Sequence, residues 1–164
     1  MTTLKTFSSA NTKKLGREFA KRIMNDGSGL TRKSAFVIAL SGDLGAGKTT
    51  FVQGFFQGLG IKQRAVSPTF IIMRRTAVPQ KKVSSHKSRI KSVYHIDAYR
   101  IKNSKGLAAL GFNEILSNPE NIVLIEWAEN IKRILPKGAS WIRFKHGKKE
   151  RERTLIFSKN LLLN

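Results

Sequence analysis

Apolar residues along the chain follow two different spacings, and the two spacings alternate. Continuous apolar runs at 35–40 and 122–125 predict strands that are buried on both faces, and the run at 92–96 predicts a third strand. Segments with apolar residues three and four positions apart, which are typical of amphipathic helices, lie at 11–24, 48–59, 107–116 and 129–135. Strands that alternate with helices predict an α/β fold with a mostly parallel sheet.

Shorter runs complete the predicted sheet. Residues 71–73 predict a short strand, and the runs at 141–144 and 154–157, joined by a charged turn, predict an antiparallel pair at the C-terminal edge. The polar and basic stretch at about 74–91 predicts an insertion-like loop. No repeat and no break in composition divides the chain, so we expect a single domain over residues 1–164.

A glycine-rich segment follows the first of the buried runs. Residues 42–49, GDLGAGKT, match the phosphate-binding pattern G-x-x-x-x-G-K-[ST] at every fixed position. The glycines allow turns in which successive backbone N–H groups converge on phosphate oxygens, and the helix that begins here adds its unpaired N-terminal donors. Lys48 supplies a charge for the outer phosphates, and the hydroxyl of Thr49 is a ligand for Mg²⁺. The sequence therefore predicts a nucleoside triphosphate site.

Two acidic residues stand at the ends of predicted strands. Asp97 follows the run at 92–96, and Glu126 follows the run at 122–125. Ligands of parallel sheets lie beyond the carboxyl ends of the strands, where a magnesium–nucleotide site requires a carboxylate. Both acids are candidates, and their spacing leaves open which one holds the metal and which one orients water. His95 shares a strand face with Asp97, so the pattern fits either a His–Asp pair or a histidine satisfied within the sheet.

The net charge of the chain indicates which classes of partner it can bind. The 31 Lys and Arg against 10 Asp and Glu give a formal charge of +21, which favours nucleic acid, an acidic protein face or a membrane surface. The basic stretch at 74–91 fits either a solvated loop or a contact with RNA, and it lacks the aromatic residues of a single-strand stacking platform. The chain has no cysteine and no apolar run long enough to span a bilayer, so we expect a soluble, cytoplasmic protein with no membrane partner.

Five motifs occur along the chain in series: GDLGAGKTT at 42–50, SPTF at 67–70, YHIDAYR at 94–100, LGF at 110–112 and IEWAE at 125–129. With this series the chain closely resembles the TsaE family, also called YjeE, the bacterial ATPases of tRNA threonylcarbamoyladenosine synthesis. The resemblance covers nearly the whole chain and implies a three-layer P-loop NTPase-like fold with weak ATP hydrolysis. It also implies partnership with the TsaB–TsaD heterodimer, which transfers the threonylcarbamoyl group to tRNA. In that family the ATPase transfers no group itself, and its nucleotide cycle supports repeated turnover by the partners.

The resemblance implies roles for individual residues. It assigns Lys48 to the β- and γ-phosphates of ATP, while Thr49 and Glu126 hold Mg²⁺. Asp97 organises the hydrolytic site, so that Lys48, Asp97 and Glu126 are the expected catalytic residues. The expected nucleotide contacts in the loop are Leu44, Gly45, Ala46, Gly47, Lys48, Thr49 and Thr50.

The resemblance implies further parts of the site. It assigns the segment at 67–70, which includes Thr69, to a switch-like loop that senses the γ-phosphate. In a looser assignment, Ser9 and Thr12 match the region that lies against the nucleotide base. The sequence alone favours a core position for Trp127, whereas the resemblance implies a position beside the nucleotide or the partner surface.

Two other functions are open from the residues. A small-molecule P-loop kinase would use Arg74 and Arg75 as a lid, but the chain has no acceptor-site motif. A basic, nucleotide-regulated RNA-binding protein would account for the charge, but the intact phosphate loop and strand-end acids argue against a vestigial site. We expect an ATPase of this sequence to be slow alone, because no arginine is obviously placed on the γ-phosphate, although Arg151 or Arg153 could supply one.

Overall fold

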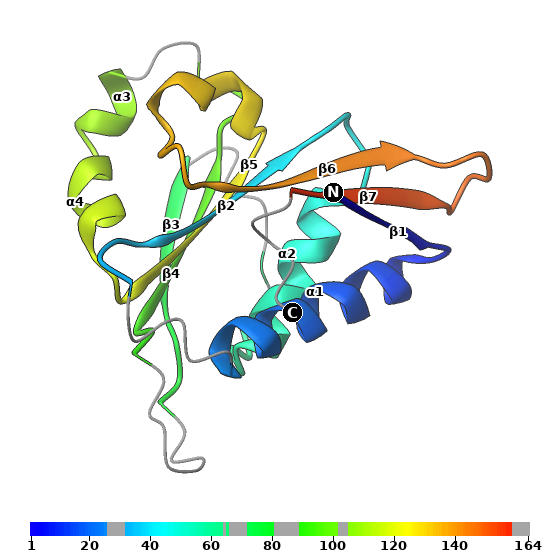
Figure 1. The fold of residues 1–164 in the computed structure, drawn as a ribbon, viewed down its shortest axis with the longest axis horizontal. Helices are drawn as coiled ribbons and strands as arrows, with labels where there is room; N and C mark the ends of the chain where they lie inside the picture. Colours follow the sequence, from blue (N-terminus) through cyan, green and yellow to red (C-terminus); the bar gives the residue numbers. More distant parts are fainter. Residues whose placement is uncertain (26–31, 64, 66–71, 81–88, 102–104, 159–164) are drawn as a thin grey trace.

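Seven strands, four α-helices and a 3₁₀-helix make up the described part of the computed structural model (Figure 1). The structure describes residues 1–25, 32–63, 65, 72–80, 89–101 and 105–158. In chain order the elements are β1 (Thr2–Thr6), α1 (Ser9–Asn25), β2 (Phe36–Ser41), α2 (Lys48–Gly58), β3 (Met73–Ala77), β4 (Ser92–Asp97), α3 (Lys105–Ala108), α4 (Phe112–Ser117), β5 (Asn121–Glu126), η2 (Ala128–Ile134), β6 (Ser140–His146) and β7 (Arg153–Phe157). No helix within these described ranges is both long enough and apolar enough to cross a bilayer.

The strands form one sheet in the order β1-β7-β6-β2-β5-β4-β3. Its four central strands, β6, β2, β5 and β4, run parallel. At one edge β3 is antiparallel to β4, and at the other edge β7 is antiparallel to both β6 and β1. This topology confirms the predicted α/β fold with a mostly parallel centre and an antiparallel C-terminal pair.

Helices cover both faces of the sheet, which gives a three-layer arrangement (Figure 1). Ile38 and Leu40 of β2 belong to an apolar cluster with α1 and α2. Val37 and Ala39, which alternate with them, belong to a second cluster with α3, α4 and η2. The continuous apolar run of β2 follows from this burial on both sides, as expected of a central parallel strand.

The N-terminal strand β1 is absent from the sequence-based expectation because its residues are polar. Within β1 only Thr6 is buried. The strand pairs antiparallel with β7, from Thr2 opposite Phe157 to Thr6 opposite Arg153. Backbone pairing, and not an alternation of apolar side chains, therefore places β1 at the sheet edge.

Other differences lie at element boundaries. The strand expected at 71–73 begins at Met73 and continues to Ala77, so residues 74–77 of the basic stretch are an edge strand whose polar, partly exposed side chains gave no strand pattern. The helix expected at 107–116 is divided into α3 and α4 at Gly111, where a φ of 70° interrupts it. The loop expected before β3 and residues 81–88 of the basic stretch lie outside the described residues.

The helices α1 and α2 approach each other closely at glycines. A Cβ on Gly54 would lie 2.0 Å from the backbone oxygen of Lys13, and a Cβ on Gly16 would lie 2.3 Å from that of Phe51. Because side chains are absent at these points, the two helix backbones meet directly. The contact fixes the position of α2, and with it the end of the glycine-rich loop that leads into α2.

Replacement of Gly54 by alanine is expected to lower the free energy of unfolding by about 2 kcal/mol or more, because the new Cβ would force the helix backbones apart. Urea-induced unfolding measures this change. Gly106→Ala in α3 is the matched control, since a Cβ there meets nothing within 4 Å and stability should be unchanged or slightly higher. Equal stability of the two variants would contradict the close packing.

Candidate nucleotide site

The carboxyl ends of three parallel strands meet at one edge of the sheet. β2 pairs with β5 so that Leu40 lies opposite Glu126, and β5 pairs with β4 so that Glu126 lies opposite Asp97. The two strand-end acids are therefore on neighbouring strands. They lie next to the point where the glycine-rich loop leaves β2.

The loop forms a compact turn between β2 and α2. Its glycines have positive φ angles, 126° at Gly42, 73° at Gly45 and 100° at Gly47. Gly42 is also closely packed, because a Cβ there would lie 2.1 Å from the backbone oxygen of Phe144. The backbone N–H of Ala46 donates to the oxygen of Asp43 over 3.2 Å, and α2 begins at Lys48. This is the strand, loop and helix arrangement that the motif requires.

A cavity of about 450 Å³ lies against this loop. It is lined by the loop, the first turn of α2, both strand-end acids and two aromatic residues: Leu44, Gly45, Ala46, Gly47, Lys48, Thr49, Thr50, Asp97, Tyr99, Glu126 and Trp127. The loop residues, the acids and the tryptophan singled out in the sequence thus border one space. Tyr99 is the lining residue that the sequence analysis missed.

A chain of polar contacts links Thr49 to the sheet. The hydroxyl of Thr49 donates to Oε2 of Glu126 over 2.7 Å, and Oε1 of Glu126 lies 2.8 Å from Nε2 of His95. Glu126 is 2% exposed and His95 is 1% exposed, so the carboxylate is held at both oxygens inside the protein. Of the two interpretations of His95, the structure supports a histidine satisfied within the sheet, paired with Glu126 and not with Asp97.

Lys48, the first residue of α2, is buried and its ammonium has three partners. Its ammonium donates to the backbone oxygen of Gly42 and, over 2.9 Å, to that of Asp43, and it lies 3.7 Å from the centre of the Trp127 ring. Burial lowers the pKa of Lys48 below its ordinary value, although nearby carboxylates, Glu126 first among them, act in the opposite direction. The cation is thus held by neutral groups beside the cavity.

Asp97 and two aromatic residues also line the cavity. Oδ1 of Asp97 accepts the backbone N–H of Tyr99 over 2.9 Å, which fixes the carboxylate at the end of β4. The rings of Tyr99 and Trp127 lie 4.9 Å apart. Trp127 is half-buried and has a φ of 57°, a conformation that turns the chain from β5 into η2. It contacts both the apolar core and the cavity.

Ser9 and Thr12 do not line this cavity. Ser9 is exposed at the start of α1, and the buried hydroxyl of Thr12 lies 2.7 Å from that of Thr6. A Cβ on Gly47 would lie 3.7 Å from Cγ2 of Thr12, so Thr12 borders the loop outside the cavity. Their position beside the base stays a prediction, and Thr69 lies outside the described residues.

The cavity offers oxygen atoms of the type that Mg²⁺ prefers as ligands. Magnesium takes oxygen ligands, commonly one or two from the protein together with substrate phosphates. The hydroxyl of Thr49 and the carboxylate of Glu126 are adjacent oxygens, and Asp97 follows on the next strand. In the part of the chain that the structure describes, no group of three or more His, Cys, Asp or Glu gathers as a metal site.

Contacts that the sequence analysis did not anticipate hold the loop at its flanks. Oε1 of Glu129 accepts the backbone N–H of Gly42 over 3.2 Å. His146 and Arg153, from the β6–β7 hairpin, also contact the loop. Glu129 lies in the IEWAE motif, so the sequence marked its segment although it assigned this residue no role. No local pattern reveals the hairpin contacts, because they depend on the order of strands in the sheet.

The fold and the loop define a protein of the P-loop class. The model of the family described as threonylcarbamoyl adenosine biosynthesis protein TsaE matches residues 6–155. The chain belongs to the TsaE family, which acts in tRNA threonylcarbamoyladenosine biosynthesis.

Individual relatives agree with this membership. The tRNA threonylcarbamoyladenosine biosynthesis protein TsaE of Haemophilus influenzae is 32% identical over 148 residues, which cover 90% of this chain and 84% of the relative. The protein of the same name from Bacillus subtilis is 37% identical over 123 residues, or 74% of this chain and 70% of the relative. The crystal structure of Bacillus subtilis YdiB superposes with a TM-score of 0.67 at 28% identity, covering 95% of this chain and 83% of that one.

Replacement of Lys48 by methionine is expected to change the pH dependence of the free energy of unfolding. Burial lowers the folded-state pKa of Lys48 below the ordinary 10.5. Between the lowered and the ordinary pKa the unfolded chain binds more protons, so the parent gains stability as pH rises through this window. The variant lacks this group, so its stability relative to the parent should fall as pH rises.

Urea-induced unfolding at about pH 7 and about pH 10 measures this difference. Lys14→Met on the exposed side of α1 is the control, and its stability relative to the parent should not change with pH in this way. A stability difference between Lys48→Met and the parent that is the same at both pH values would contradict the lowered pKa of Lys48.

Proposed function

We propose that this chain is a Mg²⁺-dependent ATPase that supports tRNA threonylcarbamoyladenosine modification by the TsaB–TsaD heterodimer in the cytoplasm. It transfers no group itself, and its nucleotide cycle enables the partners to turn over repeatedly. The observation that carries the proposal is that Lys48, Thr49 and Glu126 border one cavity at the carboxyl edge of parallel strands. Membership in the TsaE family supports the role in tRNA modification.

Lys48 binds the β- and γ-phosphates in this proposal. Its ammonium is held by two backbone oxygens and the ring of Trp127, none of which carries a net charge. Phosphate oxygens would replace these neutral partners with anionic ones, which relieves the cost of burying the cation. The exchange supports a preference of the loop for an anionic ligand.

Thr49 and Glu126 hold Mg²⁺ in this proposal. The hydroxyl of Thr49 donates its proton to Glu126, which leaves its oxygen lone pairs available to a cation. His95 holds the other carboxylate oxygen and so limits rotation of Glu126. Bound Mg²⁺ supplies neutralisation of charge on the phosphate oxygens. Asp97, fixed by the N–H of Tyr99, organises the water for hydrolysis.

Hydrolysis by the chain alone is expected to be slow. Of the two arginines considered for the γ-phosphate, Arg153 donates to the backbone oxygens of Gly45, Glu150 and Glu152. Arg151 is exposed in the turn between β6 and β7. Neither lines the cavity. This arrangement supports a dependence on partners, because charge that develops on the γ-phosphate requires a placed cation for fast reaction.

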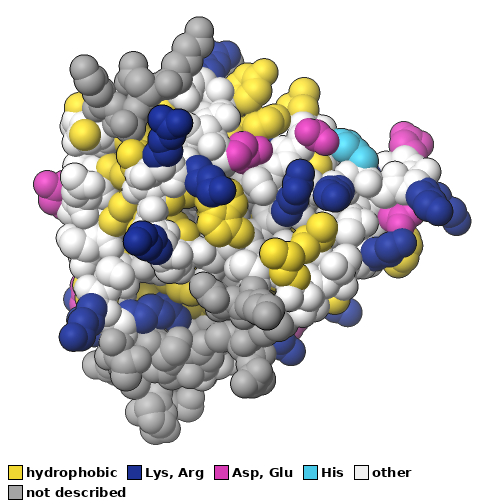
Figure 2. All heavy atoms as spheres, turned by 45° about the horizontal axis from the view of Figure 1, so that its top comes forward, with side chains coloured by type: hydrophobic (Ala, Val, Ile, Leu, Met, Phe, Trp, Pro, Cys, Tyr) yellow, Lys and Arg dark blue, Asp and Glu magenta, His cyan; other side chains and the backbone are white. Residues whose placement is uncertain are grey.

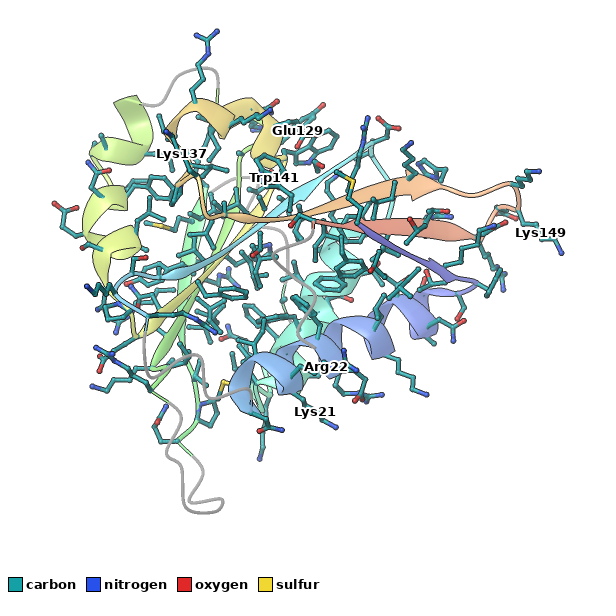
Figure 3. The ribbon with its side chains drawn as sticks, viewed as in Figure 1. Lys21, Arg22, Glu129, Lys137, Trp141 and Lys149 are labelled. Atoms are coloured by element: carbon teal, nitrogen blue, oxygen red, sulfur yellow. The ribbon has the colours of Figure 1, made fainter. Side chains whose placement is uncertain are left out.

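A direct contact with tRNA is favoured by the surface charge. Lys and Arg side chains are spread over the face seen in Figure 2. Lys21 and Arg22 extend from α1, and Lys149 extends from the hairpin turn (Figure 3). With a formal charge of +21 such groups would attract a polyanion at low salt. A small-molecule kinase has less support, since Arg74 and Arg75 lie in β3 and not in a lid loop.

The test measures ATP hydrolysis with Mg²⁺ by the chain alone and with purified TsaB–TsaD and tRNA. We expect slow turnover alone, an increase with the partners, and a loss of about a hundredfold or more in Glu126→Ala. The loss is expected because Glu126 is the carboxylate that positions Thr49 at the cavity.

Glu120→Ala is the matched control. Glu120 is the residue before the start of β5, whereas Glu126 ends that strand. Glu120 pairs with Lys91 over 2.7 Å, so its replacement removes one negative charge far from the cavity. Its turnover should remain near that of the parent. Turnover that does not respond to TsaB–TsaD would refute the proposed partners, and full turnover in Glu126→Ala would refute the proposed site.

A further inference from the structure

The hairpin formed by β6 and β7 lies along the glycine-rich loop. The backbone of Phe144 packs against Gly42, where a Cβ would lie 2.1 Å from the Phe144 oxygen. Further along β6, Nε2 of His146 lies 3.0 Å from the backbone oxygen of Leu44. From β7, Nε of Arg153 donates to the backbone oxygen of Gly45 over 3.1 Å. The hairpin therefore touches the loop at three successive points.

The two side-chain contacts act on consecutive peptide groups of the loop. A backbone oxygen accepts only, so His146 donates from Nε2 to Leu44, and Arg153 donates to Gly45. In a trans peptide the C=O and the following N–H point in opposite directions. Holding the oxygens of Leu44 and Gly45 toward the hairpin therefore turns the N–H groups of Gly45 and Ala46 away from it.

The hairpin donors contact the loop from outside the lining of the cavity. Leu44, Gly45 and Ala46 line the cavity, whereas His146 and Arg153 do not. The stem of Arg153 also passes close to the loop, since a Cβ on Gly47 would lie 3.9 Å from its Cγ. A glycine-rich loop loses conformational entropy when a ligand orders it, which weakens binding. Contacts that order the loop beforehand lower this cost, and we call the contacts of His146 and Arg153 with the loop the brace.

The brace is itself held in place. A second guanidinium nitrogen of Arg153 donates to the backbone oxygens of Glu150 and Glu152, over 2.6 Å and 2.8 Å. The carboxylate of Glu152 in turn lies 3.0 Å from the ammonium of Lys5 in β1. Arg153 thus joins the hairpin turn to the loop, and Glu152 joins the turn to the edge strand β1.

We propose that Arg153 and His146 are positioning residues that preorganise the loop for phosphate from outside the cavity. The proposal rests on the proposed function in that the ligand is a nucleotide phosphate. It assigns Arg153 to the loop backbone and not to the γ-phosphate. Because these contacts order the loop before a ligand binds, they should strengthen the binding of ADP and of ATP equally.

The binding test compares Arg153→Met with Arg151→Met. Methionine keeps an apolar stem but removes the donors, and Arg151 carries the same charge on an exposed side chain two residues earlier, in the turn before β7. Calorimetric titration without Mg²⁺ is expected to show about three- to tenfold weaker binding of both ADP and ATP in Arg153→Met. Arg151→Met should bind within about twofold of the parent.

A second pair of variants tests His146. His146→Ala is expected to weaken both nucleotides, and His146→Gln, whose amide nitrogen can donate to Leu44, should restore part of the loss. Three results would overturn the proposal: parental affinity in Arg153→Met, equal loss in Arg151→Met, and loss confined to ATP. The last result would assign Arg153 to the γ-phosphate instead.

Amide hydrogen exchange separates failure of this inference from failure of the proposed function. Exchange of a peptide that spans the loop, measured without nucleotide, should be faster in Arg153→Met than in the parent and in Arg151→Met. If the parent binds no nucleotide but its loop still exchanges more slowly than that of Arg153→Met, the nucleotide site is refuted and the ordering of the loop by Arg153 is supported. Equal exchange in the parent and Arg153→Met would refute the brace even if nucleotide binds.

Discussion

The parallel pairing of β2 with β5 and of β5 with β4 is the constraint on which the candidate site depends. This register sets Leu40 opposite Glu126 and Glu126 opposite Asp97, so the loop and both acids meet at one edge. A shift by one residue would turn Glu126 to the other face of the sheet. Burial opposes such a shift, because every side chain of β5 from Asn121 to Glu126 is buried. Apolar packing on both faces of the sheet thus determines where the polar groups lie.

The site buries three polar side chains beside the cavity. Lys48, Glu126 and His95 are each at most 5% exposed. Carbonyl oxygens and the Trp127 ring surround the lysine ammonium, and Thr49 and His95 contact the two oxygens of Glu126. Buried polar groups are costly unless they are satisfied, and satisfied networks are rigid. The lowered pKa of Lys48 indicates that its neutral partners compensate burial incompletely. An anionic ligand would offset the remaining cost of burying the Lys48 ammonium. This cost therefore favours the binding of a phosphate, as the proposed activity requires.

Most central elements could be predicted from the sequence because burial leaves a pattern. The runs at 35–40 and 122–125 gave β2 and β5, and helical spacing gave α1 and α2. Prediction failed where backbone pairing replaces burial, as in β1 and β3, and where Gly111 interrupts a helix. In the site, the loop motif and the strand-end acids were found because their positions follow from local spacing. Tyr99 and Glu129 lay inside recognised motifs without an assigned role. The hairpin contacts of His146 and Arg153 required the strand order β7-β6-β2, which no local pattern contains.

We propose that Glu126 and the first turn of α2 act together on a metal–nucleotide complex. Calorimetric titration of ATP into the parent and into Thr49→Val, with and without Mg²⁺, tests this joint action. Valine has nearly the shape of threonine but cannot coordinate a cation or donate to Glu126. We expect Mg²⁺ to tighten ATP binding by the parent, and we expect Thr49→Val to lose this gain while keeping its magnesium-free affinity. A magnesium-dependent gain that survives in Thr49→Val, or a parent that binds no ATP, would refute the joint action of Thr49 and Glu126 on bound metal–nucleotide.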